Sequence, residues 1–186
     1  MIITLEFKNG LIMTQQPVRF ETLIEHHHDE IYSYLWRMMY SAGYDDYELV
    51  AQDLTQDVFL KAYRAYNRLR ANSNYRAWLY KIATNCAMSR LKQQQRDSVR
   101  YTPLDDNLAH NTVQAIDERI SDQEFLQHVE RRIVMLPAKQ RMALVMRYVH
   151  ELDYAEIAEA LGCSQESARA NVYQALKRLR REIEAE

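Results

Sequence analysis

Glycine and proline are scarce in this chain, and their scarcity limits what it can fold into. The 186 residues include only three glycines and three prolines, whereas alanine, leucine, arginine, glutamine and glutamate are frequent. Few turn-forming residues and many helix-favouring residues predict long helices with short connections. Because no segment alternates convincingly between apolar and polar residues as a half-buried strand does, the sequence predicts an all-α fold.

Apolar residues recur at spacings of three and four in three segments of the first half of the chain. This periodicity predicts helices over residues 18–40, 47–69 and 75–95, separated by polar loops. Residues 1–17 show no clear helical period. We therefore expect a three-helix domain over residues 18–96 that follows an N-terminal extension.

The second half of the chain predicts a separate helical domain. Residues 97–120 lack a helical period and are rich in acids, which indicates a flexible acidic linker. Ser121 and Glu124 then have the spacing of a capping box, and Pro137 is well placed in the first turn of another helix. The sequence thus predicts two small helical domains, residues 18–96 and 121–186, joined by residues 97–120.

Charge is distributed in blocks, although the formal net charge is only −2. Residues 61–96 contain nine basic residues and no acid, and residues 164–181 contain five basic residues against the single acid Glu166. Two solvated helix faces are one explanation of this pattern. The complete absence of acids from the first block instead favours two anion-binding surfaces.

The last third of the chain has the pattern of a helix-turn-helix. Asp153 and Glu156 have capping-box spacing at the start of a short helix. Gly162 supplies the left-handed backbone that ends this helix, Ser164 is placed to cap the next one, and Ala168 lies where the two helices approach. An ordinary helical hairpin is the alternative, which the glycine turn, the cap and the basic tail disfavour.

The outward face of the second helix of this pair carries groups that bind base edges and phosphates. These residues are Gln165, Ser167, Arg169, Asn171, Gln174 and Lys177.

Two parts of the chain together resemble the sigma-70 family of bacterial RNA polymerase sigma factors. Region 2 of that family is similar to residues 53–62 (DLTQDVFLKA) and 74–85 (NYRAWLYKIATN). Region 4 is similar to residues 136–144 (LPAKQRMAL) and 154–164 (YAEIAEALGCS). Since only a linker separates them, the plan resembles that of the extracytoplasmic-function (ECF) group.

The resemblance implies a protein that binds core RNA polymerase, recognises −10 and −35 promoter elements and promotes DNA opening. It assigns polymerase binding to Asp53, Gln56 and Asp57, which share one face of the second helix. The family uses this motif to hold the clamp helices of the polymerase's largest subunit. Acidic charge favoured near a helix N-terminus is the alternative explanation.

The acid-free block corresponds to the surface that the family uses for the −10 element. Duplex opening requires phosphate neutralisation and a surface for unpaired bases, and the family captures a flipped base at the loop 71–74. The expected −10 contacts are Arg70, Asn72, Asn74, Arg76, Lys81, Asn85, Ser89 and Lys92. Trp78 is followed by Leu79 rather than by the second tryptophan of larger sigma factors, so Trp78 is expected in the core.

The helix-turn-helix corresponds to the part of the family that binds the −35 element, with Asn171 where relatives often carry arginine. Members of the ECF group are commonly held by an anti-sigma factor, so the resemblance implies such a partner. A stand-alone helix-turn-helix regulator is the main alternative. It leaves Asp53, Asp57 and the acid-free block without a role, and a pure protein-interaction module leaves the recognition helix unexplained.

No enzymatic or metal-binding role is expected from the sequence. His26–His28 follow Glu25, but only Glu25 and His28 match a Glu-x-x-His spacing, and a di-iron bundle needs two such motifs. Neither a nucleophile with its base nor a glycine-rich phosphate loop is present. We therefore predict no cofactor.

Cys86 and Cys163 are too far apart in sequence to suggest a zinc site, and two cysteines do not make a disulfide framework. No apolar stretch approaches the about 18 residues that span a membrane, and no secretory signal is recognisable. The sequence therefore predicts a cytoplasmic protein without membrane insertion.

Overall fold

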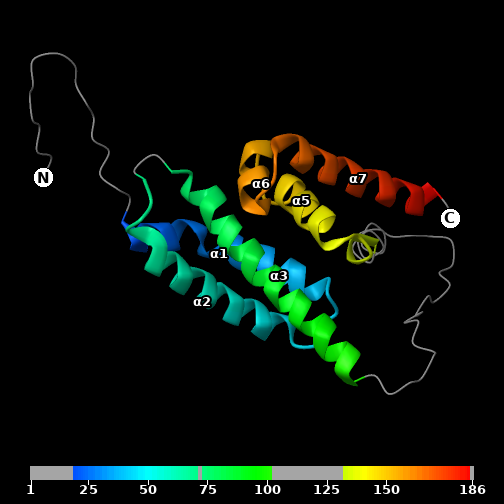
Figure 1. Ribbon diagram of the computed structural model, residues 1–186, viewed down its shortest axis with the longest axis horizontal. Coiled ribbons are helices and arrows are strands. Elements are labelled where there is room, and N and C mark those ends of the chain that lie inside the picture. Colours follow the sequence, from blue (N-terminus) through cyan, green and yellow to red (C-terminus); the bar gives the residue numbers. More distant parts are fainter. Residues whose placement is uncertain (1–18, 71–72, 102–131, 185–186) are drawn as a thin grey trace, which may run out of the picture.

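A computed structural model of the chain describes residues 19–70, 73–101 and 132–184 (Figure 1). Within these ranges the regular structure is helical and no strand occurs, so the predicted all-α class is confirmed. The labelled helices are α1 (Phe20–Tyr40), α2 (Tyr47–Tyr66), α3 (Tyr75–Tyr101), α5 (Ala138–Tyr148), α6 (Tyr154–Leu161) and α7 (Gln165–Glu184).

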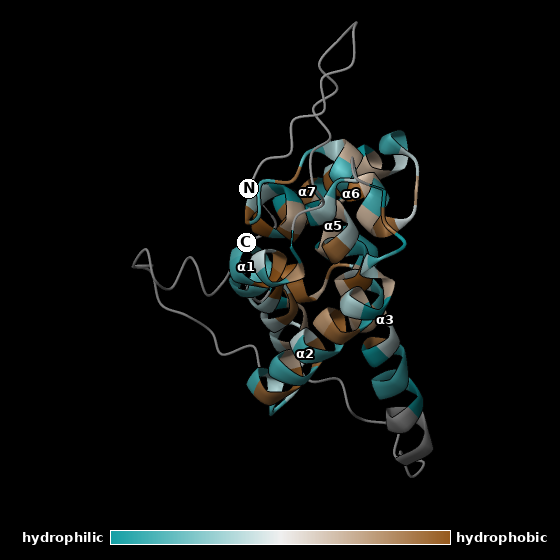
Figure 2. Ribbon diagram, turned by 90° about the vertical axis from the view of Figure 1, so that its left-hand side faces the viewer, coloured by the Kyte–Doolittle hydropathy of each residue, from teal (hydrophilic) through white to brown (hydrophobic). Residues whose placement is uncertain are grey.

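Helix boundaries differ from the prediction mainly at α2 and α3. Residues 67 and 68 form a turn after Tyr66, so α2 ends before the predicted Leu69. Helix α3 continues to Tyr101, because neither glycine nor proline occurs between Gln95 and that residue to stop it. Residues 97–101, expected in the linker, therefore belong to α3, whose C-terminal half is mostly hydrophilic (Figure 2).

Several predicted segments lie outside the described residues. These are the N-terminal extension 1–17, residues 102–120 of the expected linker, and the capping box at residues 121–124. Of the helix expected over residues 125–135, only residues 132–134 are described as helical.

The core of the first half comes from the inner faces of α1, α2 and α3. Tyr34, Leu35, Val58, Leu79 and Tyr80 are all completely buried. Burying a large apolar side chain contributes roughly 1.5–3 kcal/mol, so this packing is what orients the three helices. Trp78, by contrast, is only partly buried and packs against the edge of this core.

The helix-turn-helix forms as the sequence predicts. The Glu156 amide donates to Asp153 at 2.8 Å and the Asp153 amide donates to the Glu156 carboxylate at 2.9 Å, which completes the capping box. Gly162 has a φ of 62°, in the left-handed region. The Ser164 hydroxyl accepts from the Ser167 amide at 3.2 Å and so caps α7.

The two halves of the chain share one hydrophobic core. Met142 and Met146 of α5 and Ile157 of α6 are completely buried in the same cluster as Tyr34 and Leu79. Figure 1 shows α5, α6 and α7 together on one side of α1–α3, with α6 beside the N-terminal part of α3. The sequence predicted two domains joined by a linker, and it gave no sign that they pack together.

Candidate polymerase and nucleic-acid interfaces

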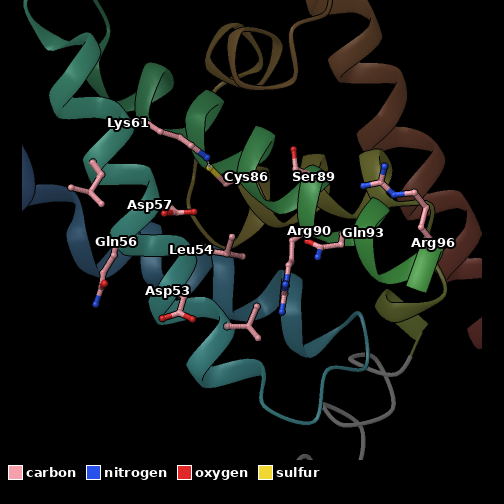
Figure 3. Close-up of a pocket in the computed structure, with 12 residues that line it drawn as sticks. Asp53, Leu54, Gln56, Asp57, Lys61, Cys86, Ser89, Arg90, Gln93 and Arg96 are labelled. Carbon is pink, nitrogen blue, oxygen red and sulfur yellow. Dashed lines mark hydrogen bonds between the residues drawn. The ribbon is translucent and has the colours of Figure 1, made fainter. Parts of the chain in front are cut away.

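Helices α2 and α3 border an open groove of about 580 Å³ (Figure 3). The predicted polymerase-binding residues Asp53, Gln56 and Asp57 are exposed on the α2 side of this groove. The same helix presents Leu60, a large apolar side chain that is 54% exposed. The structure therefore brings the three predicted residues together on one accessible face, next to apolar surface.

The opposite wall of the groove belongs to α3 and carries cations and polar groups. Ser89, Arg90, Gln93 and Arg96 line it. Arg90 packs over the Tyr44 ring at 5.4 Å from the ring centroid. The α2 wall thus offers two carboxylates and the cation Lys61, and the α3 wall offers guanidinium groups, so a partner helix with charges of both signs would be complementary to the groove.

The N-terminal end of α3 holds two predicted −10 contacts, Asn74 and Arg76. The side-chain oxygen Oδ1 of Asn74 accepts from the Ala77 backbone amide at 3.0 Å, and the side-chain Nδ2 of Asn74 donates to the Glu156 carboxylate at 3.1 Å. Arg76 is half-buried and pairs with both carboxylate oxygens of Glu30. Its closest contact is 2.9 Å to Oε2 and 3.3 Å to Oε1. The Arg76 guanidinium also donates to the backbone carbonyl of His150.

Glu30 is the centre of this polar cluster. Burial alone would raise its pKa, but hydrogen bonds from His27 and Arg76 outweigh burial and lower the pKa to about 2. Burial lowers the pKa of Arg76. The hydrogen bonds and charge of Glu30, with a smaller contribution from the Glu156 charge, outweigh burial and raise the pKa above its ordinary value. The Glu30 carboxylate and the Arg76 guanidinium are therefore both charged at neutral pH.

His150 is a buried neutral imidazole next to this cluster. Its ring lies 6.0 Å from the Tyr34 ring and 5.6 Å from the Tyr80 ring, centroid to centroid. Burial lowers the pKa of His150 to about 4, because the charged form is disfavoured away from water.

The other predicted −10 residues are spread along α3 and the turn before it. Arg70 is exposed in that turn, and Asn72 lies outside the described residues. Lys81, Asn85, Ser89 and Lys92 are all exposed on α3. They form one accessible stripe, although Ser89 also borders the groove that contains Asp53 and Asp57.

The predicted −35 residues lie on α7, which begins directly after the turn at Gly162. Gln165, Arg169, Gln174 and Lys177 are exposed, whereas Ser167 and Asn171 are half-buried. The Asn171 amide group donates to the Ser167 carbonyl at 2.9 Å.

Arg169 is held in place by the helix before it. Its guanidinium lies 5.3 Å from the Tyr154 ring centroid, and Arg147 lies 5.0 Å from the same centroid. Cation–π contacts of this kind contribute about 0.5–1 kcal/mol at exposed sites, so they orient Arg169 while leaving it accessible.

Sequence reasoning missed Glu30, His150 and Glu156 as partners of the predicted DNA-binding residues. It also missed Arg141, which is only 6% exposed and donates to the carbonyls of Ser41 and Val134 at 2.9 Å each. These partners lie far away in sequence, and no local spacing indicates them.

Comparison with known proteins decides the family. The family model for sigma-70 region 2 matches residues 23–97, and that for sigma-70 region 4 matches residues 126–179. The ECF RNA polymerase sigma-E factor of Escherichia coli (strain K12) is 32% identical over 130 residues, which cover 66% of this chain and 68% of that protein. This chain belongs to the sigma-70 family. It is an ECF sigma factor, a non-enzymatic RNA polymerase subunit for transcription initiation.

Other relatives agree in sequence and in fold. The ECF sigma factor SigW of Bacillus subtilis (strain 168) is 23% identical over 171 residues, which cover 88% of each chain. Sigma factor RpoE, solved in complex with the anti-sigma factor NepR from Bartonella quintana, superposes with a TM-score of 0.64 at 21% identity and covers 89% of this chain and 96% of its own. CnrH, solved with the cytosolic domain of CnrY, superposes with a TM-score of 0.59 at 20% identity, over 90% of this chain and 88% of its own.

The part of the chain that the structure describes offers neither a metal site nor a membrane span. No group of three or more His, Cys, Asp or Glu side chains there is arranged to hold a metal ion, and this includes the cluster His26–His28. None of the described helices is long and apolar enough to cross a membrane.

Proposed function

We propose that this sigma factor docks on core polymerase through Asp53, Gln56 and Asp57 and binds promoter DNA through α3 and α7. The observation that carries the polymerase site is the groove between α2 and α3, where the three side chains are accessible together. The clamp helices of the largest subunit are the partner, because the acids of α2 suit a helical hairpin that presents basic residues.

The −10 element is bound along α3, and the −35 element is bound by α7. On α3 the exposed stripe of Lys81, Asn85, Ser89 and Lys92 supplies cations and hydrogen-bonding groups for a strand of DNA. Arg70, Asn72, Asn74 and Arg76 complete this surface at the base-capturing end. On α7, Gln165 and Arg169 are exposed. Gln165 has the hydrogen-bonding groups for an adenine edge in the major groove, and Arg169 has those for a guanine edge.

The protein acts in the cytoplasm, and an anti-sigma factor controls it. Support for this partner comes from RpoE of Bartonella quintana, which was solved in complex with the anti-sigma factor NepR. An anti-sigma factor that covers the groove would block polymerase, and one that covers the α3 stripe would block DNA. A stand-alone helix-turn-helix regulator, the alternative considered from the sequence, would leave the groove without a role.

Run-off transcription with purified core polymerase tests the function directly. The purified chain is added to core polymerase on sheared genomic DNA, and the 5′ ends of the transcripts are mapped. We expect new start sites that share upstream sequence and appear only when the chain is added. The absence of new start sites, together with no association between the chain and core polymerase, would contradict the proposal.

A matched pair of variants on α2 tests the polymerase site. Asp57→Arg reverses one charge at the groove, and Glu48→Arg makes the same change at an exposed residue of α2 that does not line it. We expect Asp57→Arg to lose co-purification with core polymerase while Glu48→Arg keeps it, with helicity unchanged in both. Equal retention of core by the two variants would contradict the assignment of the groove.

A second pair tests the assignment of α7. Arg169→Ala is expected to weaken −35 recognition by about 1–3 kcal/mol if the guanidinium makes a bidentate base contact. Arg178→Ala removes an exposed arginine of the same helix outside the proposed base-reading set. Substitution of the base pair that Arg169 contacts should weaken −35 binding by the wild type and by Arg178→Ala. The same substitution should not weaken binding by Arg169→Ala any further. A uniform loss on every sequence would mean that Arg169 contacts phosphate.

A further inference from the structure

We infer that Lys61 and Cys86 make up a peroxide-responsive site, at which an S–N bond forms between α2 and α3 inside the groove that these helices border. Lys61 belongs to α2 and Cys86 to α3, 25 residues apart in sequence. The bond follows from the geometry of this pair, whereas its relation to polymerase rests on the proposed function of the groove.

The Lys61 amine and the Cys86 thiol are in direct contact. The Nζ atom of Lys61 donates to Sγ of Cys86 at 3.1 Å, and Figure 3 shows the amine pointing toward the sulfur. Cys86 is a free thiol and is only 4% exposed, but both residues line the open groove of about 580 Å³. A molecule as small as hydrogen peroxide can therefore approach the pair through the groove.

The surroundings of Cys86 are those of a reactive cysteine. Reactive cysteines lie in accessible surroundings that carry positive charge, whereas cysteines buried among apolar groups are inert. Arg90 and Arg96 line the same groove as Cys86. Two carboxylates line it as well, but the charged group in contact with the sulfur is the Lys61 ammonium.

The bond forms in two steps that balance. Hydrogen peroxide first oxidises the Cys86 thiol to a sulfenic acid and is itself reduced to water. The Lys61 ammonium then loses one proton to solvent, and the lone pair of the free amine attacks the sulfenic sulfur. The S–O bond breaks as the S–N bond forms, and the hydroxyl leaves as water with a second proton from the nitrogen. The product is a sulfenamide that links the two side chains.

Proximity favours the S–N bond over further oxidation. A second peroxide molecule has to arrive from solution to convert the sulfenic acid to a sulfinic acid, whereas the amine is already in contact with the sulfur. Lys61 is exposed and its side chain is flexible, so the side chain can complete the approach. The bond replaces an ammonium by a neutral nitrogen, so the charge of the groove depends on the oxidation state of Cys86.

Peptide mass spectrometry of the full-length chain tests for the bond. With Cys163→Ala in place, Cys86 is the only thiol, and the chain is treated with a small molar excess of hydrogen peroxide before digestion. We expect a linked pair of peptides about 2 Da lighter than the sum of the two, since two hydrogens are lost, and release of the link by a thiol reductant. Oxidation of Cys86 to sulfinic acid without a link, or no reaction at Cys86, would overturn the inference.

A matched pair of lysine variants identifies the amine. Lys61→Arg keeps a cation in the groove, but a guanidinium does not lose its proton in proteins and so cannot attack the sulfur. Lys139→Arg makes the same change at an exposed residue of α5 outside the groove. We expect the yield of linked peptide to fall about tenfold or more in Lys61→Arg and in Lys61→Gln, and to be unchanged in Lys139→Arg. Equal yields in all three variants would refute the role of Lys61.

Core polymerase separates this inference from the proposed function. A partner that fills the groove shields the sulfur, so core polymerase bound before peroxide is added should slow formation of the link several-fold. Serum albumin at the same thiol concentration controls for consumption of peroxide. Equal rates with polymerase and albumin would contradict the groove as the polymerase site while the bond itself stands. No link in the free chain would overturn the bond and leave the polymerase site untouched.

Discussion

Glu30→Gln removes the charge that holds Arg76, and its effect on stability follows from the geometry around Glu30. The carboxylate is bound by His27 and Arg76 and its side chain is only 21% exposed. Its pKa falls from an ordinary value of 4.5 to about 2. Because the folded-state pKa is the lower one, folding is stabilised while Glu30 is ionised, and this contribution is lost as the pH falls.

The magnitude comes from proton linkage. A pKa difference of about 2.5 units corresponds to about 3 kcal/mol at pH 7, since each unit contributes about 1.4 kcal/mol. The contribution is complete above pH 5, and by pH 3 it is reduced to about half, because much of the unfolded chain then carries a protonated Glu30. It disappears below pH 2.

Urea unfolding of the wild type, Glu30→Gln and the control Glu25→Gln from pH 7 to pH 3 measures this effect. Glu25 is exposed on the same helix, so its substitution tests the loss of a charge alone. We expect Glu30→Gln to be less stable by about 3 kcal/mol at pH 7 and the difference to shrink toward pH 3. A difference that does not change with pH, or one equal to that of Glu25→Gln, refutes the reasoning.

Three further substitutions test single features of the fold by the same unfolding measurement. Gly162→Ala should cost about 1–2 kcal/mol through its left-handed backbone alone, because nothing lies within 4 Å of the added Cβ; an unchanged stability would exclude that conformation. Asp153→Ala removes the α6 cap and should cost about 0.5–2 kcal/mol, whereas Asp153→Asn should retain most of it. Leu35→Ala should cost about 2–5 kcal/mol, while Leu49→Ala, at a residue 61% exposed, should change stability by less than about 0.5 kcal/mol.

Local patterns predicted most of the individual helices. The capping box of α6, the turn at Gly162 and the start of α7 are each specified by residues within a few positions of one another. Helix periodicity likewise predicted that Tyr34 and Leu35 are buried. These features depend on residues that are close together in the sequence, so residue spacing alone is sufficient to find them.

The packing of the two halves was not predictable in this way. Arg76 meets the His150 carbonyl 74 residues away, and Asn74 meets Glu156 82 residues away. Arg141 would be expected at the surface from its residue type, yet it is buried, with its Nη1 atom donating to two backbone carbonyls. Such contacts depend on how the folded helices pack against one another, and no local pattern in this sequence indicates that packing.

The shared exposed face of Asp53, Gln56 and Asp57 was predictable, whereas the partners of Asn74 and Arg76 were not. The three acidic and polar residues of α2 are gathered and accessible, as their helical spacing implied. Asn74 and Arg76, in contrast, are engaged by other parts of the chain. Sequence reasoning assigned them a single role, because it had no means of placing α6 beside them.

Helix α3 is continuous from Tyr75 to Tyr101, so it fixes the spacing between the residues along it. At about 1.5 Å of rise per residue, Asn74 and Ser89 are held roughly 22 Å apart along the axis, with a fixed angular phase between them. The distance from the proposed polymerase groove to the proposed −10 contacts at the N-terminal end of α3 is therefore set by the number of residues between them. Inserting one alanine in the middle of α3 would keep every side chain but rotate one end by about 100° against the other, so the proposed polymerase and −10 surfaces would no longer face in matching directions.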